Sequence, residues 1–275
     1  MSAAAAAPPI TISSELRALL RRLKLGLMLD TLPERLALAC QNHVPHVDFL
    51  ELVLADEVAR RDRTAAETRA RTARLDPTMV LERWDETATV SFDKELWAEL
   101  CTLRFVDAAA NVLVMGPVGV GKSFMANALG HIACRRRYTV AAERADRLFK
   151  RLKAARLDNS HEAEMRKLLR VDLLVIDDFA LQPLDGTETS DMYELVVERH
   201  QRASTVITSN REPPEMLAQM ADPLLAQSAM DRLQSAAYEL VVEGESYRRR
   251  QKPTATGGAS PNDDDRPTTR RRRPR

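Results

Sequence analysis

The chain has 275 residues, and its 41 lysines and arginines nearly balance its 40 aspartates and glutamates. This length allows one large core with a smaller accessory region, and the balanced charge by itself favours no class of partner. No apolar run approaches the roughly 18 residues needed to span a bilayer, and the first residues lack the basic and apolar regions of a signal peptide. The three cysteines are widely spaced, form no metal-binding pattern and favour a reducing compartment. We therefore expect a soluble, cytoplasmic protein with no membrane partner.

The N-terminal quarter of the chain is predicted to be helical. Residues 1–12 are rich in alanine and proline and are expected to be disordered. Leucines then recur at helical spacing, a second helix is predicted to begin at Pro33, and a longer helix is predicted over about 47–75. We interpret residues 13–75 as a separate helical domain, which a linker over residues 76–92 joins to the rest of the chain.

From residue 93 the pattern changes to short apolar runs that alternate with helical stretches. This pattern is typical of an α/β fold, in which helices cover both faces of a mostly parallel sheet. We predict that this second domain spans residues 93–249. Residues 250–275 are polar, end in a run of arginines and cannot bury a core, so we expect a disordered basic tail. The expected strands are 111–115, 138–142, 172–177 and 205–209.

Residues 116–123 read Gly-Pro-Val-Gly-Val-Gly-Lys-Ser, a complete phosphate-binding loop of the form G-x-x-x-x-G-K-[ST]. An apolar run precedes the loop and a helical stretch follows it, which is the context that the motif requires. Backbone N–H groups of the loop and the helix N-terminus bind phosphate oxygens, Lys122 reaches the β- and γ-phosphates, and Ser123 ligates Mg²⁺. The sequence therefore predicts a nucleoside triphosphate site rather than a glycine-rich turn that binds nothing. The expected nucleotide contacts are Gly116, Pro117, Val118, Gly119, Val120, Gly121, Lys122, Ser123 and Phe124.

Two carboxylates follow the apolar run of the predicted strand 172–177. They lie about 55 residues after Lys122, where a phosphate-loop ATPase carries its second acidic element. Asp177 is expected to help hold magnesium, and Asp178 is expected to polarise the attacking water. Alone, such a strand is as easily a core strand with a solvated end, but the phosphate loop upstream favours the functional interpretation.

A polar cluster ends the predicted strand 205–209. In a parallel sheet the carboxyl ends of all strands lie at one edge, where ligands bind. Asn210 is therefore expected near the γ-phosphate, where its amide could orient the water. The alternative is an asparagine that only caps the turn before Pro213.

Five further blocks of sequence occur in a characteristic order. They are Asp172-Leu-Leu-Val-Ile-Asp-Asp178, Ser204-Thr-Val-Ile-Thr-Ser-Asn-Arg211, Asp222-Pro-Leu-Leu-Ala226, Ala229-Met-Asp-Arg-Leu233 and Glu243-Gly-Glu-Ser-Tyr-Arg248. Together with the phosphate loop, they resemble the IstB family of AAA+ ATPases over roughly residues 15–250. These proteins are ATP-dependent helpers of a bacterial insertion-sequence transposition system, and they are similar to the DnaC helicase loaders.

The resemblance implies a P-loop NTPase of AAA+ type that binds ATP and Mg²⁺ and forms a homo-oligomer with each nucleotide between two subunits. Arg232 matches the family's arginine finger, which neutralises charge on the phosphoryl group in a neighbour's site; alternatively it pairs with Asp231 on a helix surface. Many AAA+ proteins carry glutamate in place of Asp178. The shorter side chain reaches about 1.5 Å less far, which leaves slow hydrolysis or a pure binding switch open. Arg248 is a further candidate for nucleotide contact.

Basic side chains gather in three stretches of the chain. The resemblance implies that the protein binds duplex DNA without sequence specificity and serves the transposase of the same element, with residues 13–75 recognising the partner. For any one stretch the alternative is a solvated helix face paired with nearby acids. The side chains concerned are Arg60, Arg61, Arg63, Arg69, Arg71, Arg74, Arg135, Arg136, Arg137, Arg144, Arg147, Lys150, Arg151, Lys153 and Arg156.

Three other functions share parts of this pattern. A DnaC-like replicative helicase loader shares the ATPase core and would prefer single-stranded DNA. A small-molecule or nucleotide kinase shares the phosphate loop but needs an acceptor pocket and a lid, and a non-hydrolysing ATP-binding module would fit the short Asp178. The base-binding side of the site is hard to identify, and Leu103 and Phe105 are only candidates for it.

Overall fold

The computed structural model describes residues 11–85, 87 and 89–247. Its N-terminal region is helical, as predicted. Ser13 begins the first helix by accepting a 3.1 Å hydrogen bond from the backbone N–H of Leu16. The expectations for residues 1–10 and 250–275 fall outside the described residues. The N-terminal elements are α1 (Ser14–Arg22), the 3-10 helix η1 (Gly26–Asp30), α2 (Leu32–Gln41) and α3 (His46–Thr72).

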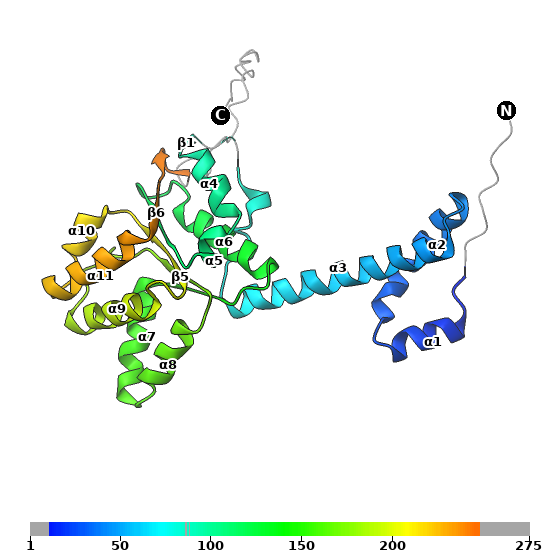
Figure 1. Cartoon of the computed structure of the whole chain (residues 1–275), viewed down its shortest axis with the longest axis horizontal. Coiled ribbons are helices and arrows are strands. Elements are labelled where there is room, and N and C mark those ends of the chain that lie inside the picture. Colours follow the sequence, from blue (N-terminus) through cyan, green and yellow to red (C-terminus); the bar gives the residue numbers. More distant parts are fainter. Residues whose placement is uncertain (1–10, 86, 88, 248–275) are drawn as a thin grey trace, which may run out of the picture.

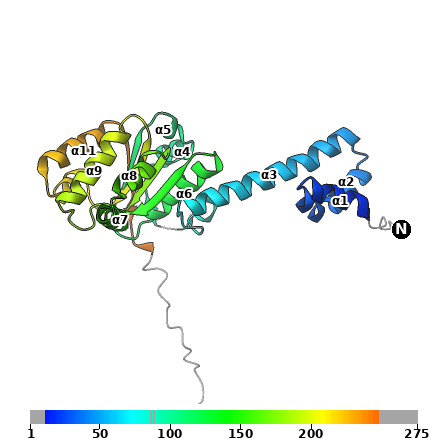
Figure 2. The ribbon, with the colours of Figure 1, turned by 90° about the horizontal axis from the view of Figure 1, so that it is seen from below.

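Helix α3 is a 27-residue arm that joins the N-terminal helices to the α/β domain (Figure 1). The first half of α3 packs with α1, η1 and α2 around a small core, which is formed by Leu20, Met28, Leu32 and Val53. Both Figure 1 and Figure 2 show α1 and α2 at the far end of this arm, away from the sheet. The N-terminal helices therefore contact the rest of the molecule only through α3 in the described part of the chain.

The second half of α3 is fixed to the α/β domain by backbone and side-chain contacts. Arg69 donates a 2.8 Å hydrogen bond to the carbonyl oxygen of Cys134, and the N–H of Ala142 donates one of 2.8 Å to the carbonyl oxygen of Ala73. Leu75 packs so closely on Gly130 that a Cβ there would lie 2.6 Å from a Leu75 methyl carbon. The end of the arm thus covers the edge of the sheet and the helix that follows the phosphate loop.

A five-stranded sheet forms the centre of the α/β domain, with strand order β3-β4-β5-β2-β6 and every neighbouring pair parallel. The four predicted strands are confirmed, although β3 begins two residues later than predicted. The edge strand β6 was not predicted. Leu240 is its one buried residue, so its sequence lacks the alternation of apolar and polar residues that indicates a strand. The strands are β2 (Asn111–Met115), β3 (Val140–Arg144), β4 (Leu173–Asp177), β5 (Ser204–Ser209) and β6 (Ala237–Val241).

Alternate residues of the buried strands face two separate cores, as the period of two in a strand requires. On one face Val112, Val114 and Val206 pack with Met125 and Leu129 of the phosphate-loop helix. The opposite face packs against four helices, α7 (Ala145–Leu157), α8 (His161–Leu169), α9 (Gly186–Arg199) and α11 (Pro223–Ser235). Helices therefore cover both sides of the sheet, which confirms the predicted fold class.

The remaining elements are short or lie on the two faces of the sheet. The antiparallel pair of β1 and β7 was not predicted, and it joins Val90–Ser91 to Glu243–Gly244 near the end of the described chain. Among the described residues, no helix is both long and apolar enough to cross a membrane. These elements are η2 (Leu81–Arg83), β1 (Val90–Ser91), α4 (Lys94–Cys101), α5 (Arg104–Asp107), α6 (Lys122–Arg135), α7 (Ala145–Leu157), α8 (His161–Leu169), α9 (Gly186–Arg199), α10 (Pro213–Leu217), α11 (Pro223–Ser235) and β7 (Glu243–Gly244).

Candidate functional site

The phosphate-binding loop connects the end of β2 to the N-terminus of α6 at the carboxyl edge of the sheet. Gly119 and Gly121 have φ values of 91° and 101°, a left-handed conformation that glycine adopts without strain. Gly116 also has a positive φ, and a Cβ there would lie 1.9 Å from the carbonyl oxygen of Val242. The glycines of the motif are therefore required by the backbone of this loop, and the motif has the strand–loop–helix setting predicted from the sequence.

Lys122 is buried at the start of α6, and its ammonium group turns back onto the loop. Its Nζ donates hydrogen bonds of 2.7 Å and 2.6 Å to the carbonyl oxygens of Gly116 and Pro117. Phosphate oxygens carry negative charge and are stronger acceptors for an ammonium group than neutral carbonyls. The lysine is thus already held over the loop, at the position from which it can bind a phosphate.

Ser123 and Asp177 meet between α6 and β4. The Ser123 hydroxyl donates a 2.8 Å hydrogen bond to Oδ1 of Asp177, and the hydroxyl of Thr208 donates to the same oxygen. A hydroxyl and a carboxylate oxygen in contact are the hard donors that Mg²⁺ prefers, so the two residues fit the predicted metal ligands. Thr208 was not singled out from the sequence. The signal that could have identified Thr208 is its position as a polar residue in a strand that is buried along its whole length.

Asp178 follows Asp177 in a left-handed conformation with φ of 55°. Its N–H donates a 2.9 Å hydrogen bond to the hydroxyl of Thr208, so β5 fixes the backbone at this carboxylate. Arg144, at the end of β3, has its Nε 3.7 Å from Oδ2 of Asp178 and 3.2 Å from a carboxylate oxygen of Asp146. From the sequence, Arg144 was a candidate for DNA contact or part of a solvated helix face; in the structure it lies beside the predicted catalytic acid.

A cavity of about 490 Å³ lies over the phosphate loop. Lys122, Ser123 and Phe124 line it from the loop and helix, and Asp178 and Asn210 line it from the ends of β4 and β5. The structure therefore brings the side chains of Lys122, Ser123, Phe124, Asp178 and Asn210 together around one cavity, whereas the predicted contacts Gly116, Pro117 and Val120 do not line it. Because the cavity also has a volume typical of small-molecule sites, it can hold a nucleotide.

Leu103 and Phe105 do not line this cavity. Both are buried in the core between the sheet and α6, which removes them as candidates for the base-binding side. Instead, the segment between α3 and α4 lines one side of the cavity. Its lining residues there are Thr78, Met79, Arg83, Trp84 and Asp85.

Arg232 lies on α11 and does not line the cavity of its own subunit. Its Nη1 donates a 2.9 Å hydrogen bond to the carbonyl oxygen of Ser228, one turn earlier, and also contacts the Ser228 hydroxyl. The alternative pairing with Asp231 is not among its contacts in the described chain. The role as an arginine finger concerns a second subunit and stays a prediction, and Arg248 lies outside the described residues.

Many of the basic side chains predicted to contact DNA take part in ion pairs. Arg137 lies 2.9 Å from Asp62, and Arg151 lies 2.7 Å from Glu143. Such pairing is what the alternative of a solvated, acid-partnered helix face predicts. Further pairs are Arg60–Glu57, Arg61–Glu57, Arg74–Glu143, Arg135–Glu82, Lys153–Asp185 and Arg156–Asp191.

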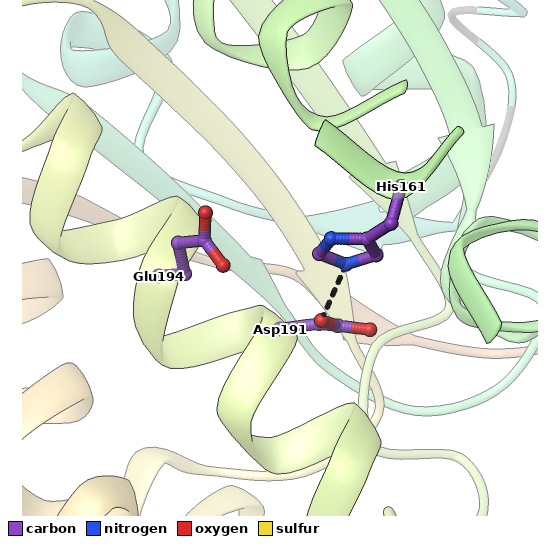
Figure 3. Close-up of side chains that lie close together, drawn as sticks. All are labelled: His161, Asp191 and Glu194. Carbon is purple, nitrogen blue, oxygen red and sulfur yellow. Dashed lines mark hydrogen bonds and ion pairs between the residues drawn. The ribbon is translucent and has the colours of Figure 1, made fainter. Parts of the chain in front are cut away.

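A second cluster is formed by His161 at the start of α8 and by Asp191 and Glu194 on α9 (Figure 3). Their nearest nitrogen and oxygen atoms lie within 4.8 Å of one another. However, Oδ1 of the buried Asp191 lies 2.9 Å from Nε2 of His161 and accepts a hydrogen bond from Arg156. Because the guanidinium of Arg156 already neutralises this carboxylate, we interpret the cluster as an ion-pair network that joins α7, α8 and α9.

Comparison with known proteins agrees with the site. The family model described as IstB-like ATP binding protein matches residues 18–255. An insertion-sequence protein of Mycobacterium tuberculosis, named for ATP binding, is 35% identical over 242 residues, which cover 88% of this chain and 96% of that protein.

A second relative and a solved structure extend the comparison. The ATP-binding protein of insertion sequence IS21 from Pseudomonas aeruginosa is 32% identical over 241 residues, covering 88% of this chain and 91% of that protein. The crystal structure of DnaI is similar with a TM-score of 0.50 at 19% identity, covering 61% of this chain and 89% of that chain, and this likeness concerns the fold alone. The chain belongs to the family of IstB-like ATP-binding proteins.

Proposed function

We propose that this protein is an ATPase that assembles on duplex DNA and serves the transposase of an insertion sequence. The observation that supports ATP hydrolysis is the cavity over the phosphate loop, where Lys122, Ser123, Asp178 and Asn210 converge from three segments of the chain. The support for the transposition role is the match to relatives that are themselves named as insertion-sequence ATP-binding proteins.

Each residue of the site has a separate task in phosphoryl transfer to water. Backbone N–H groups of the loop and the ammonium of Lys122 bind the β- and γ-phosphates. Ser123 and Asp177 hold Mg²⁺, which when bound neutralises charge on the phosphate oxygens. Asp178 accepts the hydrogen bond of the attacking water, and the exposed amide of Asn210, at the neighbouring strand end, orients it.

Assembly would complete the site. Arg232 donates a hydrogen bond to Ser228 on its own helix and does not line the nucleotide cavity of its own subunit. We therefore infer that it acts on the nucleotide bound by a neighbouring subunit. A guanidinium there would neutralise charge that develops on the transferred phosphoryl group. ATP binding would thereby favour the oligomer, and hydrolysis would release it. A helicase loader shares this chemistry, and preference for single-stranded DNA distinguishes it.

The test measures ATP hydrolysis over a series of protein concentrations, without DNA, with single-stranded DNA and with duplex DNA. We expect turnover per subunit to rise with protein concentration and to be stimulated most by duplex DNA. Lys122→Ala serves as the inactive control. Stronger stimulation by single-stranded DNA would favour the loader, turnover that is linear in protein and indifferent to DNA would contradict assembly, and ATP binding without turnover would make the protein a binding switch.

A further inference from the structure

We propose that the segment over residues 76–85, which leads from the arm α3 to the α/β domain, forms the nucleoside side of the nucleotide site, and that Trp84 is the ring against which the base stacks. The inference rests on the proposed nucleotide binding and adds the part of the site that recognises the base. Neither this segment nor Trp84 belongs to a sequence motif of the phosphate loop.

The role of the segment is indicated by its place in the nucleotide cavity, where it forms a wall separate from the phosphate loop. One wall is the phosphate loop with Lys122 and Ser123, and it is the wall that binds phosphates. The other wall is the 76–85 segment, which contributes Met79, Arg83 and Trp84. When the phosphates lie on the loop, the nucleoside extends toward the remaining lining. This segment supplies Met79 and Trp84 to that lining, and Leu181 and Tyr247 add to it from other parts of the chain.

Trp84 is held in place by the phosphate loop and by two other aromatic rings. A Cβ on Gly121 would lie 3.3 Å from the Cη2 and Cζ3 atoms of Trp84, so the ring sits with this edge directly over the last glycine of the loop. Its ring centroid lies 5.3 Å from that of Phe124 and 5.8 Å from that of Phe92, both in edge-to-face arrangements. A ring fixed in this way binds a base with little loss of side-chain entropy.

The segment is also bonded to the helix that binds the phosphates. The N–H of Asp76 donates a 3.0 Å hydrogen bond to Asn127, whose amide donates one of 2.8 Å to the carbonyl oxygen of Ser123. Further along, Arg135 of α6 pairs with Glu82 through a 3.0 Å hydrogen bond. These contacts fix the segment to the middle and the C-terminal end of α6, the helix whose first turn carries Ser123.

Stacking on an aromatic ring is tolerant of base identity, since every base has a π-face. Trp84 therefore contributes to the affinity for nucleosides in general, and its removal should lower the affinity for ATP and for ADP alike. Removal of Trp84 should not lower the affinity for inorganic tripolyphosphate, which has the phosphates of ATP but neither base nor ribose. This contrast separates a base-stacking residue from one that merely supports the loop.

The experiment uses the two tryptophans of the chain, Trp84 and Trp97. Trp97 packs against Phe92, with ring centroids 6.4 Å apart, and does not line the cavity. In a Trp97→Phe variant of the full-length protein, we expect the emission of Trp84 to change on titration with ATP or ADP and to stay constant with tripolyphosphate. In the matched Trp84→Phe variant, the emission of Trp97 should not respond to any of the three.

Calorimetric titrations of the same ligands give the affinity. We expect Trp84→Ala to lower the affinity for ATP and ADP by about ten-fold or more, Trp84→Phe to lower it less, and both to bind tripolyphosphate like the parent. An unchanged ATP affinity in Trp84→Ala, or a silent Trp84 in a Trp97→Phe protein that binds ATP, would overturn the inference alone. A parent protein that binds neither ATP nor tripolyphosphate would overturn the proposed function and this inference with it.

Discussion

The hydroxyl of Ser123 donates a 2.8 Å hydrogen bond to Oδ1 of Asp177 and so joins the first turn of α6 to the end of β4. Thr208, at the end of β5, donates to the same oxygen. Three elements that are distant in sequence are thereby tied together at the point where the phosphate loop ends. The two expected magnesium ligands are thus placed by contacts within the protein itself, which predicts that they act as a unit.

Replacement of Ser123 by alanine removes one ligand of that unit. We expect the affinity for ATP in the presence of Mg²⁺ to fall by about ten-fold, since the loss of groups that hold or orient metal ligands typically costs 10- to 100-fold. The affinity in the presence of EDTA should be nearly unchanged. Titration calorimetry under both conditions measures the difference, and Ser123→Thr, which keeps the hydroxyl, is the control. An equal loss with and without Mg²⁺ would show that the hydroxyl does not act through the metal.

Replacement of Asp178 by asparagine is expected to keep ATP binding and to lower turnover by about 100-fold or more, because the amide cannot accept a proton from water. Steady-state hydrolysis and calorimetric ATP binding measure the two effects. Asp146→Asn is the matched control, since Asp146 also contacts Arg144 but does not line the nucleotide cavity. A similar fall in both variants would mean that the Arg144 contact, rather than the Asp178 carboxylate, controls the rate.

The phosphate loop and the strand-end residues could be predicted from the sequence because their signals are local. A complete loop motif lies between an apolar run and a helix, and parallel strands bring Asp178 and Asn210 to one edge. The structure places both residues around the same cavity as Lys122. Local pattern and sheet geometry were sufficient for this part of the site.

The nucleoside side could not be predicted, because it depends on contacts between distant segments. Residues 76–92 were interpreted as a linker, yet Trp84 lies over Gly121 and Glu82 pairs with Arg135. Leu103 and Phe105, which precede the loop in sequence, are instead buried in the core. Neither the apolar spacing nor the charge of the segment reveals which partner each side chain meets in space.

Glu57 gives a pH dependence to the stability of the helical N-terminal region. Hydrogen bonds from Arg60, together with those from Arg61, lower the pKa of the Glu57 carboxyl from 4.5 to about 2. A carboxylate whose pKa is lower in the folded state stabilises that state above the unfolded pKa, and this stabilisation is lost as the pH falls through the folded value. We expect Glu57→Gln to lower stability at pH 7 by about 2 kcal/mol. The difference should shrink between pH 4.5 and 2.

Thermal unfolding followed by circular dichroism at several pH values measures this difference. Asp62→Asn is the control, because Asp62 also pairs with an arginine, Arg137, but both side chains are largely exposed. A surface pair of this kind contributes about 1 kcal/mol or less. A Glu57→Gln protein with parental stability at pH 7 would contradict the assigned role of the buried carboxylate.

Replacement of Arg232 by alanine tests whether a neighbouring subunit completes the site. Since Arg232 contacts Ser228 and does not line its own cavity, we expect Arg232→Ala to bind ATP normally and to lose about 10³-fold in turnover. Mixing it with Lys122→Ala protein, which is also inactive, should restore hydrolysis, because the Lys122→Ala subunits still present Arg232 to the intact sites of their neighbours. Arg202→Ala, at an exposed arginine paired with Glu198, is the control and should keep full activity. Parental turnover by dilute, monomeric Arg232→Ala protein, or a mixture that stays inactive while the two variants co-assemble, would remove Arg232 from the role of a finger.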